Sequence, residues 1–272
     1  MDASFIRICA VPALAPEPAD GLRAASAPFG TLATFVSDRD LNCTAAELRL
    51  SGEAEDALRA IAAALQASAR KSLLSFEVLG AAEPDAAQEH ALSIALAELL
   101  DTPIYGARRD APASVWVERR PISFGVDGFA IRAASPAVAR PESRSPGASL
   151  EFGAPTLLMK AGLHGVPAAA LRRICDAIGS QRGGLLHMGA YPAISVASGD
   201  PLIVLECSDP AKSPLSRALD LLEVEAARYG GALGQTVLLS HIPLSSLLAV
   251  LTARMHVPVE PAQIIETHVA PS

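Results

Sequence analysis

The spacing of apolar and polar residues changes several times along the chain and predicts strands that alternate with helices. Short apolar or alternating runs bounded by proline, glycine or serine are typical of strands, and longer runs with apolar residues three or four apart are typical of helices. In the first half, this pattern predicts strands over residues 6–11, 31–37, 44–50, 73–78 and 104–105, and helices over residues 53–70 and 84–100.

The helical spacing also predicts which side of each of these two helices is buried. Ser51 can cap the first helix, and Pro84 stands in the first turn of the second, where proline is tolerated. The expected core positions are Leu58, Ile61, Ala62, Leu65 and Ala69 in the first helix, and Ala91, Ile94, Ala95 and Leu99 in the second.

The second half repeats this order of elements. Strands are predicted over residues 156–160, 185–188, 202–206 and 232–239, and helices over residues 167–178, 214–229 and 243–255, with Ser213 as the cap of the middle helix. Between the halves, short strands are predicted at residues 114–117 and 129–131, and three prolines within residues 135–147 predict a linker.

These elements predict an α/β (α+β) fold with two similar β-α-β-β-α-β subdomains, each a mixed sheet with helices outside. A bare sheet face would expose apolar side chains, so the two sheets are expected to face each other or to cover a ligand. The expected boundaries are residues 1–110 for the first subdomain, 111–147 for a linker, 148–258 for the second subdomain and 259–272 for a tail.

Charge, cysteine content and the length of apolar runs indicate which partners and which cellular location are expected for the protein. The net charge of −7 argues against a nucleic-acid or anionic membrane surface. The four cysteines form no CxxC pair, so no metal site is expected, and buried reduced thiols are the simpler interpretation. No apolar run reaches the ~18 residues of a membrane span, and no basic segment precedes one, so the cytoplasm is the expected location.

Two motifs resemble the glutamate formiminotransferase family, whose members move a formimino group between glutamate and tetrahydrofolate. The run Ser37-Asp38-Arg39-Asp40-Leu41-Asn42 resembles the family's Asp-x-Asp-x-Asn turn. The second motif comprises Asp209-Pro210-Ala211-Lys212-Ser213-Pro214-Leu215, a helical run to Gly230, and Ile242-Pro243-Leu244. Over residues 5–108 and 146–255, the resemblance implies two facing subdomains around a folate tunnel. It implies tetrahydrofolate or a related reduced pterin as co-substrate and a glutamate-like amine as partner, and a homodimer is a further expectation.

The family's catalytic His-Pro-Arg motif is missing. The corresponding segment, residues 69–78, contains no histidine, and the nearest one is His90 on the following predicted helix. Without such a base the usual transfer would lose about 10²- to 10⁴-fold in rate. The resemblance therefore implies a divergent one-carbon transferase with a substitute acid or base. The alternatives are a non-catalytic folate-, pterin- or partner-binding member, and an enzyme with another substrate.

Four residues are candidates for the catalytic role. Asp38 and Asp40 can orient an amine or transfer a proton, although aspartates are also ordinary turn residues. Glu206 lies late in an apolar strand, where it is either a buried acid or base or an outward-facing residue. His241, just before Ile242-Pro243, is either an acid or base or a surface histidine.

Four further residues are candidates for binding the co-substrate. Asn42 belongs to the Asp-x-Asp-x-Asn-like turn, and Ser208 stands where the family has a threonine. Lys160 can meet a folate carboxylate or be solvated, and His164 lies in a glycine-flanked turn that can approach a ligand. No phosphate-binding loop, dinucleotide fingerprint, serine-hydrolase elbow or zinc-protease motif is present.

Overall fold

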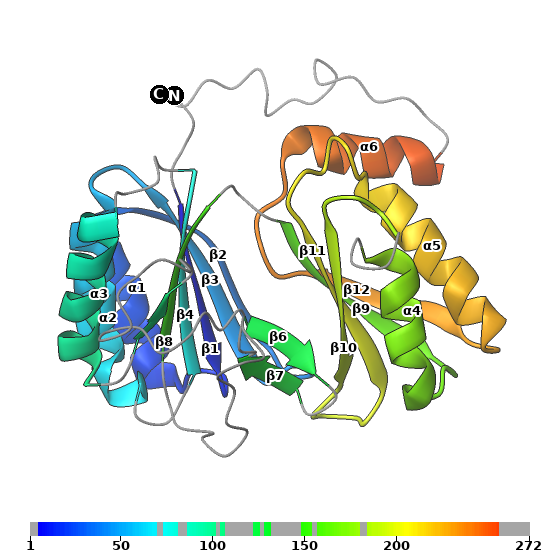
Figure 1. The fold of residues 1–272 in the computed structure, drawn as a ribbon, viewed down its shortest axis with the longest axis horizontal. Helices are drawn as coiled ribbons and strands as arrows, with labels where there is room; N and C mark the ends of the chain where they lie inside the picture. Colours follow the sequence, from blue (N-terminus) through cyan, green and yellow to red (C-terminus); the bar gives the residue numbers. More distant parts are fainter. Residues whose placement is uncertain are drawn as a thin grey trace. The chain divides into compact units, whose positions relative to one another are not determined.

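Contacts in the computed structural model divide the chain into two units, Met1–Pro155 with Ala193–Gly199, and Thr156–Pro192 with Asp200–Ser272. The structure describes residues 5–69, 73–80, 86–101, 104–106, 122–125, 128–131, 148–153, 157–179 and 184–255. Each unit has its own sheet, with helices beside it (Figure 1).

The first unit is built on a mixed six-stranded sheet in the order β2-β3-β1-β4-β8-β5. The first four strands in that order pair antiparallel, and β8 pairs parallel with β4 and β5. The helices lie on one face of the sheet (Figure 1). The strands of this sheet are β1 (Phe5–Val11), β2 (Gly30–Asp38), β3 (Cys43–Leu50), β4 (Leu73–Leu79), β5 (Ile104–Gly106) and β8 (Ala148–Gly153). A separate hairpin consists of β6 (Ile122–Gly125) and β7 (Gly128–Ile131). The helices are α1 (Pro16–Ser26), α2 (Ala54–Ala69) and α3 (Ala86–Leu100).

The second unit is built on a four-stranded sheet in the order β10-β11-β9-β12. Strands β11 and β12 pair antiparallel with β9, and α4 and α5 lie on one face of the sheet (Figure 1). The elements are β9 (Leu157–His164), the 3-10 helix η1 (Ala168–Ala170), α4 (Leu171–Ile178), β10 (Met188–Ile194), β11 (Pro201–Cys207), α5 (Leu215–Arg228), β12 (Ala232–Leu238) and α6 (Leu244–Met255).

The two units share one topology. Each contains β-α-β-β-α-β, as β1-α1-β2-β3-α2-β4 and β9-α4-β10-β11-α5-β12, and in each the spatial order of the four strands is second, third, first, fourth. This is the split βαβ arrangement. The predicted α/β class and its repeated unit are confirmed, while the facing of the two sheets stays a prediction.

The core of the first unit lies between its sheet and its helices. The predicted buried face of α2 is confirmed, because Leu58, Ile61 and Leu65 are fully buried against strand residues such as Phe76. The predicted face of α3 is wrong. Its buried apolar positions are Leu92, Leu96 and Leu100, whereas Ile94 is 37% exposed and Ala91 is exposed. Apolar residues occur on all sides of α3, so the spacing of these residues does not determine the buried side, and the packing of the helix against its neighbours does.

Three local predictions are corrected by hydrogen bonding and pairing. Ser51 donates its hydroxyl to the carbonyl of Phe29 at 3.0 Å and does not cap α2, which begins at Ala54. Residues 185–187 form a turn, and the strand begins only at Met188. Ser213 does not cap α5, because its hydroxyl donates to the carbonyl of Leu186.

The first boundary of the second subdomain also moves. Strand β8 begins at Ala148 and pairs with β4 and β5, so residues 148–153 belong to the first unit and not to the second. The predicted strand at residues 114–117, the predicted linker at residues 135–147 and the predicted tail lie outside the described residues. The predicted strand at residues 129–131 is present as β7.

All four cysteines, Cys9, Cys43, Cys175 and Cys207, are free and buried, as expected. Burial in a medium that solvates charge poorly raises the pKa of the Cys175 thiol to about 12. Within the described residues, no helix is both long enough and apolar enough to cross a membrane.

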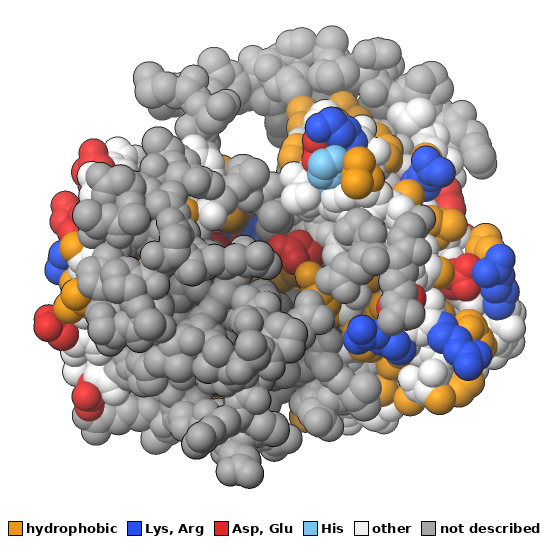
Figure 2. Space-filling model, viewed as in Figure 1, with side chains coloured by type: hydrophobic (Ala, Val, Ile, Leu, Met, Phe, Trp, Pro, Cys, Tyr) orange, Lys and Arg blue, Asp and Glu red, His pale blue; other side chains and the backbone are white. Residues whose placement is uncertain are grey.

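Exposed basic side chains of the second unit have acidic neighbours. Figure 2 shows lysine and arginine side chains scattered there among hydrophobic and acidic ones. Arg228 lies 2.6 Å from a carboxylate oxygen of Glu225, and Arg254 lies 2.8 Å from one of Glu223. Glu225 is buried and only its partner Arg228 is exposed, whereas the Arg254 pair lies at the surface and contributes at most about 1 kcal/mol to stability.

Candidate functional site

The Asp38–Asn42 turn joins β2 to β3 and is held by its own side chains. Oδ1 of Asp38 accepts the backbone N–H of Leu41 at 2.9 Å. Asn42 has a φ of 49°, a left-handed conformation that asparagine adopts more readily than most residues, and its Oδ1 accepts the N–H of Ala13 at 3.4 Å. Two of the residues selected from sequence therefore also shape the turn.

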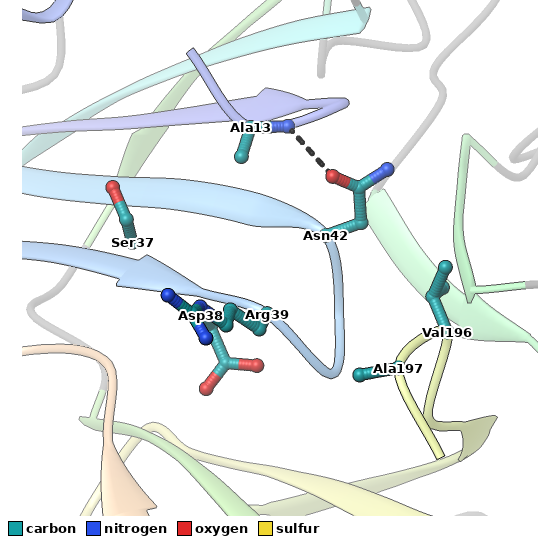
Figure 3. Close-up of a pocket in the computed structure, with 7 residues that line it drawn as sticks. All are labelled: Ala13, Ser37, Asp38, Arg39, Asn42, Val196 and Ala197. Atoms are coloured by element: carbon teal, nitrogen blue, oxygen red, sulfur yellow. Dashed lines mark hydrogen bonds between the residues drawn. The ribbon is translucent and has the colours of Figure 1, made fainter. Parts of the chain in front are cut away.

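A pocket of about 520 Å³ opens beside this turn in the first unit (Figure 3). Its volume lies within the roughly 300–1,000 Å³ that is usual for small-molecule sites. It is lined by Ala13, Ser37, Asp38, Arg39, Asn42, Val196 and Ala197. The Asp38–Asn42 turn is therefore one wall of a cavity of ligand size.

The opposite wall comes from residues 195–199, here called the wall segment. The hydroxyl of Ser195 donates to Oδ1 of Asp40 at 2.7 Å, and the backbone N–H of Val196 donates to the carbonyl of Asp40 at 2.7 Å. Figure 3 shows Val196 and Ala197 on a separate loop beside the turn. Asp40 does not line the pocket, and its carboxylate holds the wall segment in place.

The polar side chains that line the pocket are the Ser37 hydroxyl, the Asp38 carboxylate, the Arg39 guanidinium and the Asn42 amide. The Arg39 side chain is exposed, and no described residue forms an ion pair with it. Asn42 turns its oxygen toward Ala13, and its amide nitrogen points away from Arg39, whose guanidinium lies beside Asp38 (Figure 3). A planar guanidinium suits a carboxylate, which accepts two parallel N–H bonds from arginine.

Lys160 and Glu206 share one face of the second unit's sheet. Leu158 lies opposite Glu206 and two residues before Lys160, and side chains two apart on a strand point to the same face. Lys160 is only 5% exposed, so the solvated alternative is wrong. Glu206 is half-buried, and its Oε2 accepts the hydroxyl of Tyr191 at 3.2 Å.

The remaining candidates are separate from one another. The N–H and hydroxyl of the exposed Ser208 both donate to the carbonyl of His187, at 3.0 and 3.4 Å. His164 is exposed at the end of β9, and its ring lies directly over Gly234. His241 is half-buried after Ser240. These three residues, with Lys160 and Glu206, belong to the second unit, and none lines the pocket beside the Asp38–Asn42 turn.

Sequence reasoning missed a buried charge cluster in the first unit. Nη1 of Arg7 lies 3.0 Å from Oε2 of Glu77, and its Nε lies 2.6 Å from Oε1 of Glu47. Burial alone would lower the pKa of Arg7, but the carboxylates of Glu77 and Glu47 outweigh it and raise that pKa. The available signal was a charged residue inside each of three largely apolar strands.

The first part of the second motif, the run that begins at Asp209, has a structural role. Oδ1 of Asp209 accepts the N–H groups of Ala211 and Lys212, both at 3.2 Å. The side chain of Lys212 adds an ion pair at 2.9 Å, and these donors hold the pKa of Asp209 below its ordinary value, the side-chain bond from Lys212 most of all. This run therefore builds the turn before α5.

The described residues contain no group of three or more histidine, cysteine, aspartate or glutamate side chains arranged to hold a metal ion. No family model matches the chain, and no curated protein matches it. Among solved structures, one similar chain is an unknown protein from Galdieria sulphuraria, at 12% identity over 88% of this chain and 98% of that one. Its TM-score of 0.26 is too low to bear on the fold or the function.

Proposed function

We propose that the protein is a divergent formiminotransferase-like protein that binds a reduced folate, or a related pterin, and that it holds a folate through the carboxylates of the glutamate part. The observation that carries this proposal is the pocket of about 520 Å³ on the Asp38–Asn42 turn. This turn, which resembles the Asp-x-Asp-x-Asn turn of the formiminotransferases, lines the pocket with Asp38, Arg39 and Asn42. Arg39 supplies the donors that a carboxylate needs.

Binding without turnover is the better supported form of this proposal. A general base must lie within hydrogen-bond reach of the proton that it removes. Oδ1 of Asp38 accepts the N–H of Leu41, and Oδ1 of Asp40 accepts the hydroxyl of Ser195. Both aspartates thus act as structural acceptors, in keeping with the missing His-Pro-Arg motif.

One-carbon transfer to a glutamate-like amine is the second candidate. It is supported by Glu206, whose carboxylate accepts the Tyr191 hydroxyl on the sheet face that also carries Lys160. A carboxylate with a phenol and an amine nearby has the groups that acid–base transfer uses. His241 is the other candidate base in this version of the proposal.

The proposal includes a cytoplasmic location. Four free, buried thiols fit a reducing compartment. A homodimer remains a prediction.

Calorimetric titration of the full chain with 5-formyltetrahydrofolate tests the proposal. At a free ligand concentration of 100 times the dissociation constant, the free energy of unfolding, measured by denaturation, should rise by about 2.7 kcal/mol. Arg39→Gln should weaken binding by about 10- to 100-fold, because it removes charge-assisted hydrogen bonds. Arg173→Gln, an exposed arginine on α4, is the matched control and should bind as the wild type does. Absence of binding by any reduced folate or pterin at millimolar concentration would refute the proposal.

A further inference from the structure

We propose that Ser195 and Asp40 are positioning residues that hold the wall segment as the apolar side of the pocket, and that Val196 and Ala197 thereby select the ligand. The selected class is a carboxylate with an aromatic or other apolar group beside it, in preference to a small dicarboxylate. The identity of the ligand rests on the proposed function. The positioning of the wall segment rests on the contacts alone.

The wall segment is closed on itself by hydrogen bonds from its own backbone. The N–H of Ser198 donates to the hydroxyl oxygen of Ser195 at 3.0 Å, and the N–H of Gly199 donates to the carbonyl of Ser195 at 2.8 Å. Gly199 has a φ of 78°, which glycine adopts without strain. The segment therefore has a defined shape, and what remains to be fixed is its position.

Asp40 fixes that position at two points. Its carboxylate accepts the Ser195 hydroxyl, and its carbonyl accepts the Val196 N–H, each at 2.7 Å. The Ser195 side chain is almost completely buried, with 3% exposed. A short bond to a carboxylate in a site shielded from water is stronger than a bond between neutral groups. One residue of the turn thus anchors the whole opposite wall.

The anchored wall presents apolar side chains to the cavity. Val196 is 61% exposed although it is β-branched and apolar, and it lines the pocket together with Ala197 and Ala13. The donors of Arg39 and Asn42 lie on the turn. A ligand that uses both walls needs an acceptor group at one side and apolar surface at the other. A folate meets this need with its glutamyl carboxylate and aminobenzoyl ring, whereas glutarate offers only the carboxylates.

The positioning is tested first without ligand, by amide hydrogen exchange on the full chain. Ser195→Ala should speed exchange at the Ser198 amide, which bonds the hydroxyl itself, and at the Val196 amide, whose bond to the Asp40 carbonyl is kept in place by that hydroxyl. Ser195→Thr keeps a hydroxyl and should restore protection at both amides. Ser245→Ala, an exposed serine on α6, is the control and should change neither. Unchanged exchange in Ser195→Ala would overturn the positioning role.

The selection is tested by titration with 5-formyltetrahydrofolate and with glutarate. Ser195→Ala and Val196→Ala should each weaken folate binding by about 10-fold and leave glutarate binding unchanged, and Ser195→Thr should restore folate binding. Equal losses for the two ligands, or none, would overturn the selection. A wild type that binds neither ligand but shows the expected exchange pattern would refute the proposed function while supporting the positioning role.

Discussion

Nε of Arg7 on β1 lies 2.6 Å from Oε1 of Glu47 on β3, and neither side chain is more than 1% exposed. The two residues are direct neighbours in the register of the sheet, and Glu77 on β4 completes the cluster from the other side. Burying charges costs solvation energy that their mutual attraction has to offset. The stability of the first unit should therefore be sensitive to any change that leaves one of these charges without its partner.

Arg7→Met should lower the free energy of unfolding by about 3–5 kcal/mol, because it leaves the buried carboxylate of Glu47 without its cation and also removes the partner of the half-buried Glu77. The double variant Arg7→Met/Glu47→Leu should recover part of that loss. Urea denaturation followed by circular dichroism measures both. Arg23→Met, which breaks the exposed pair with Asp20, is the control and should cost less than about 1 kcal/mol. Equal losses in the buried and the exposed pair would contradict the argument.

Leu96→Ala and Ile94→Ala distinguish the observed buried face of α3 from the one that spacing predicts. Leu96 is fully buried, so its truncation should cost about 2–5 kcal/mol. Ile94 is 37% exposed and should cost less than about 1 kcal/mol. Thermal unfolding of both variants decides the matter, and a larger loss for Ile94→Ala would favour the face predicted from spacing.

Gly30→Ala should destabilise the first unit where Gly52→Ala does not. A Cβ at Gly30 would collide with the backbone carbonyl oxygen of Arg49 on the paired strand, which cannot move without breaking the sheet. The expected cost is about 1–3 kcal/mol. A Cβ at Gly52 meets no atom within 4 Å. Chemical denaturation of the two variants should separate them, and matching midpoints would count against the predicted collision.

The buried thiols should make the protein less stable at high pH. In the folded chain the pKa of Cys175 is about 12, against an ordinary value of 9.0, because burial disfavours the thiolate. Between these values the unfolded chain loses its proton first, so the free energy of unfolding should fall as pH rises from 9 toward 12. Cys175→Ala should make this fall shallower. Alkylation at pH 8 should be slow until urea is added, and rapid labelling of native Cys175 would contradict its burial.

Standard glutamate formiminotransferase activity should be absent or very weak. If turnover is measured, Glu206→Gln and His241→Ala should lower kcat more than they change KM, because acid and base groups act on the transition state. Steady-state assays with formiminoglutamate and tetrahydrofolate provide both constants. Turnover of about 1–10³ per second that survives both substitutions would place the chemistry elsewhere.

The parts of the fold that follow from sequence are those with local signals. The buried face of α2 was predictable because Leu58, Ile61 and Leu65, its large apolar residues, recur at helical spacing. The face of α3 was not, because apolar residues occur all round that helix. The turn at Asp38 was predictable from residue types that favour turns.

The parts that could not be predicted depend on contacts distant in sequence. Ser195 meets Asp40 across 155 positions, and nothing in a short Ser-Val-Ala-Ser-Gly loop indicates that contact. Arg7, Glu47 and Glu77 were each visible as a charge in an apolar strand. Their pairing depends on the register of three strands, which local spacing does not determine.

The first unit is not one continuous stretch of chain, because Ala193–Gly199 belongs to it. A gene fragment that ends at Pro155 would encode the turn with Arg39 and Asn42 but would omit Val196 and Ala197. The pocket therefore cannot be passed to another protein by copying the leading half of the gene. Recombination between the two repeats would separate its two walls. A gene must therefore encode residues up to Gly199 for the complete pocket to form.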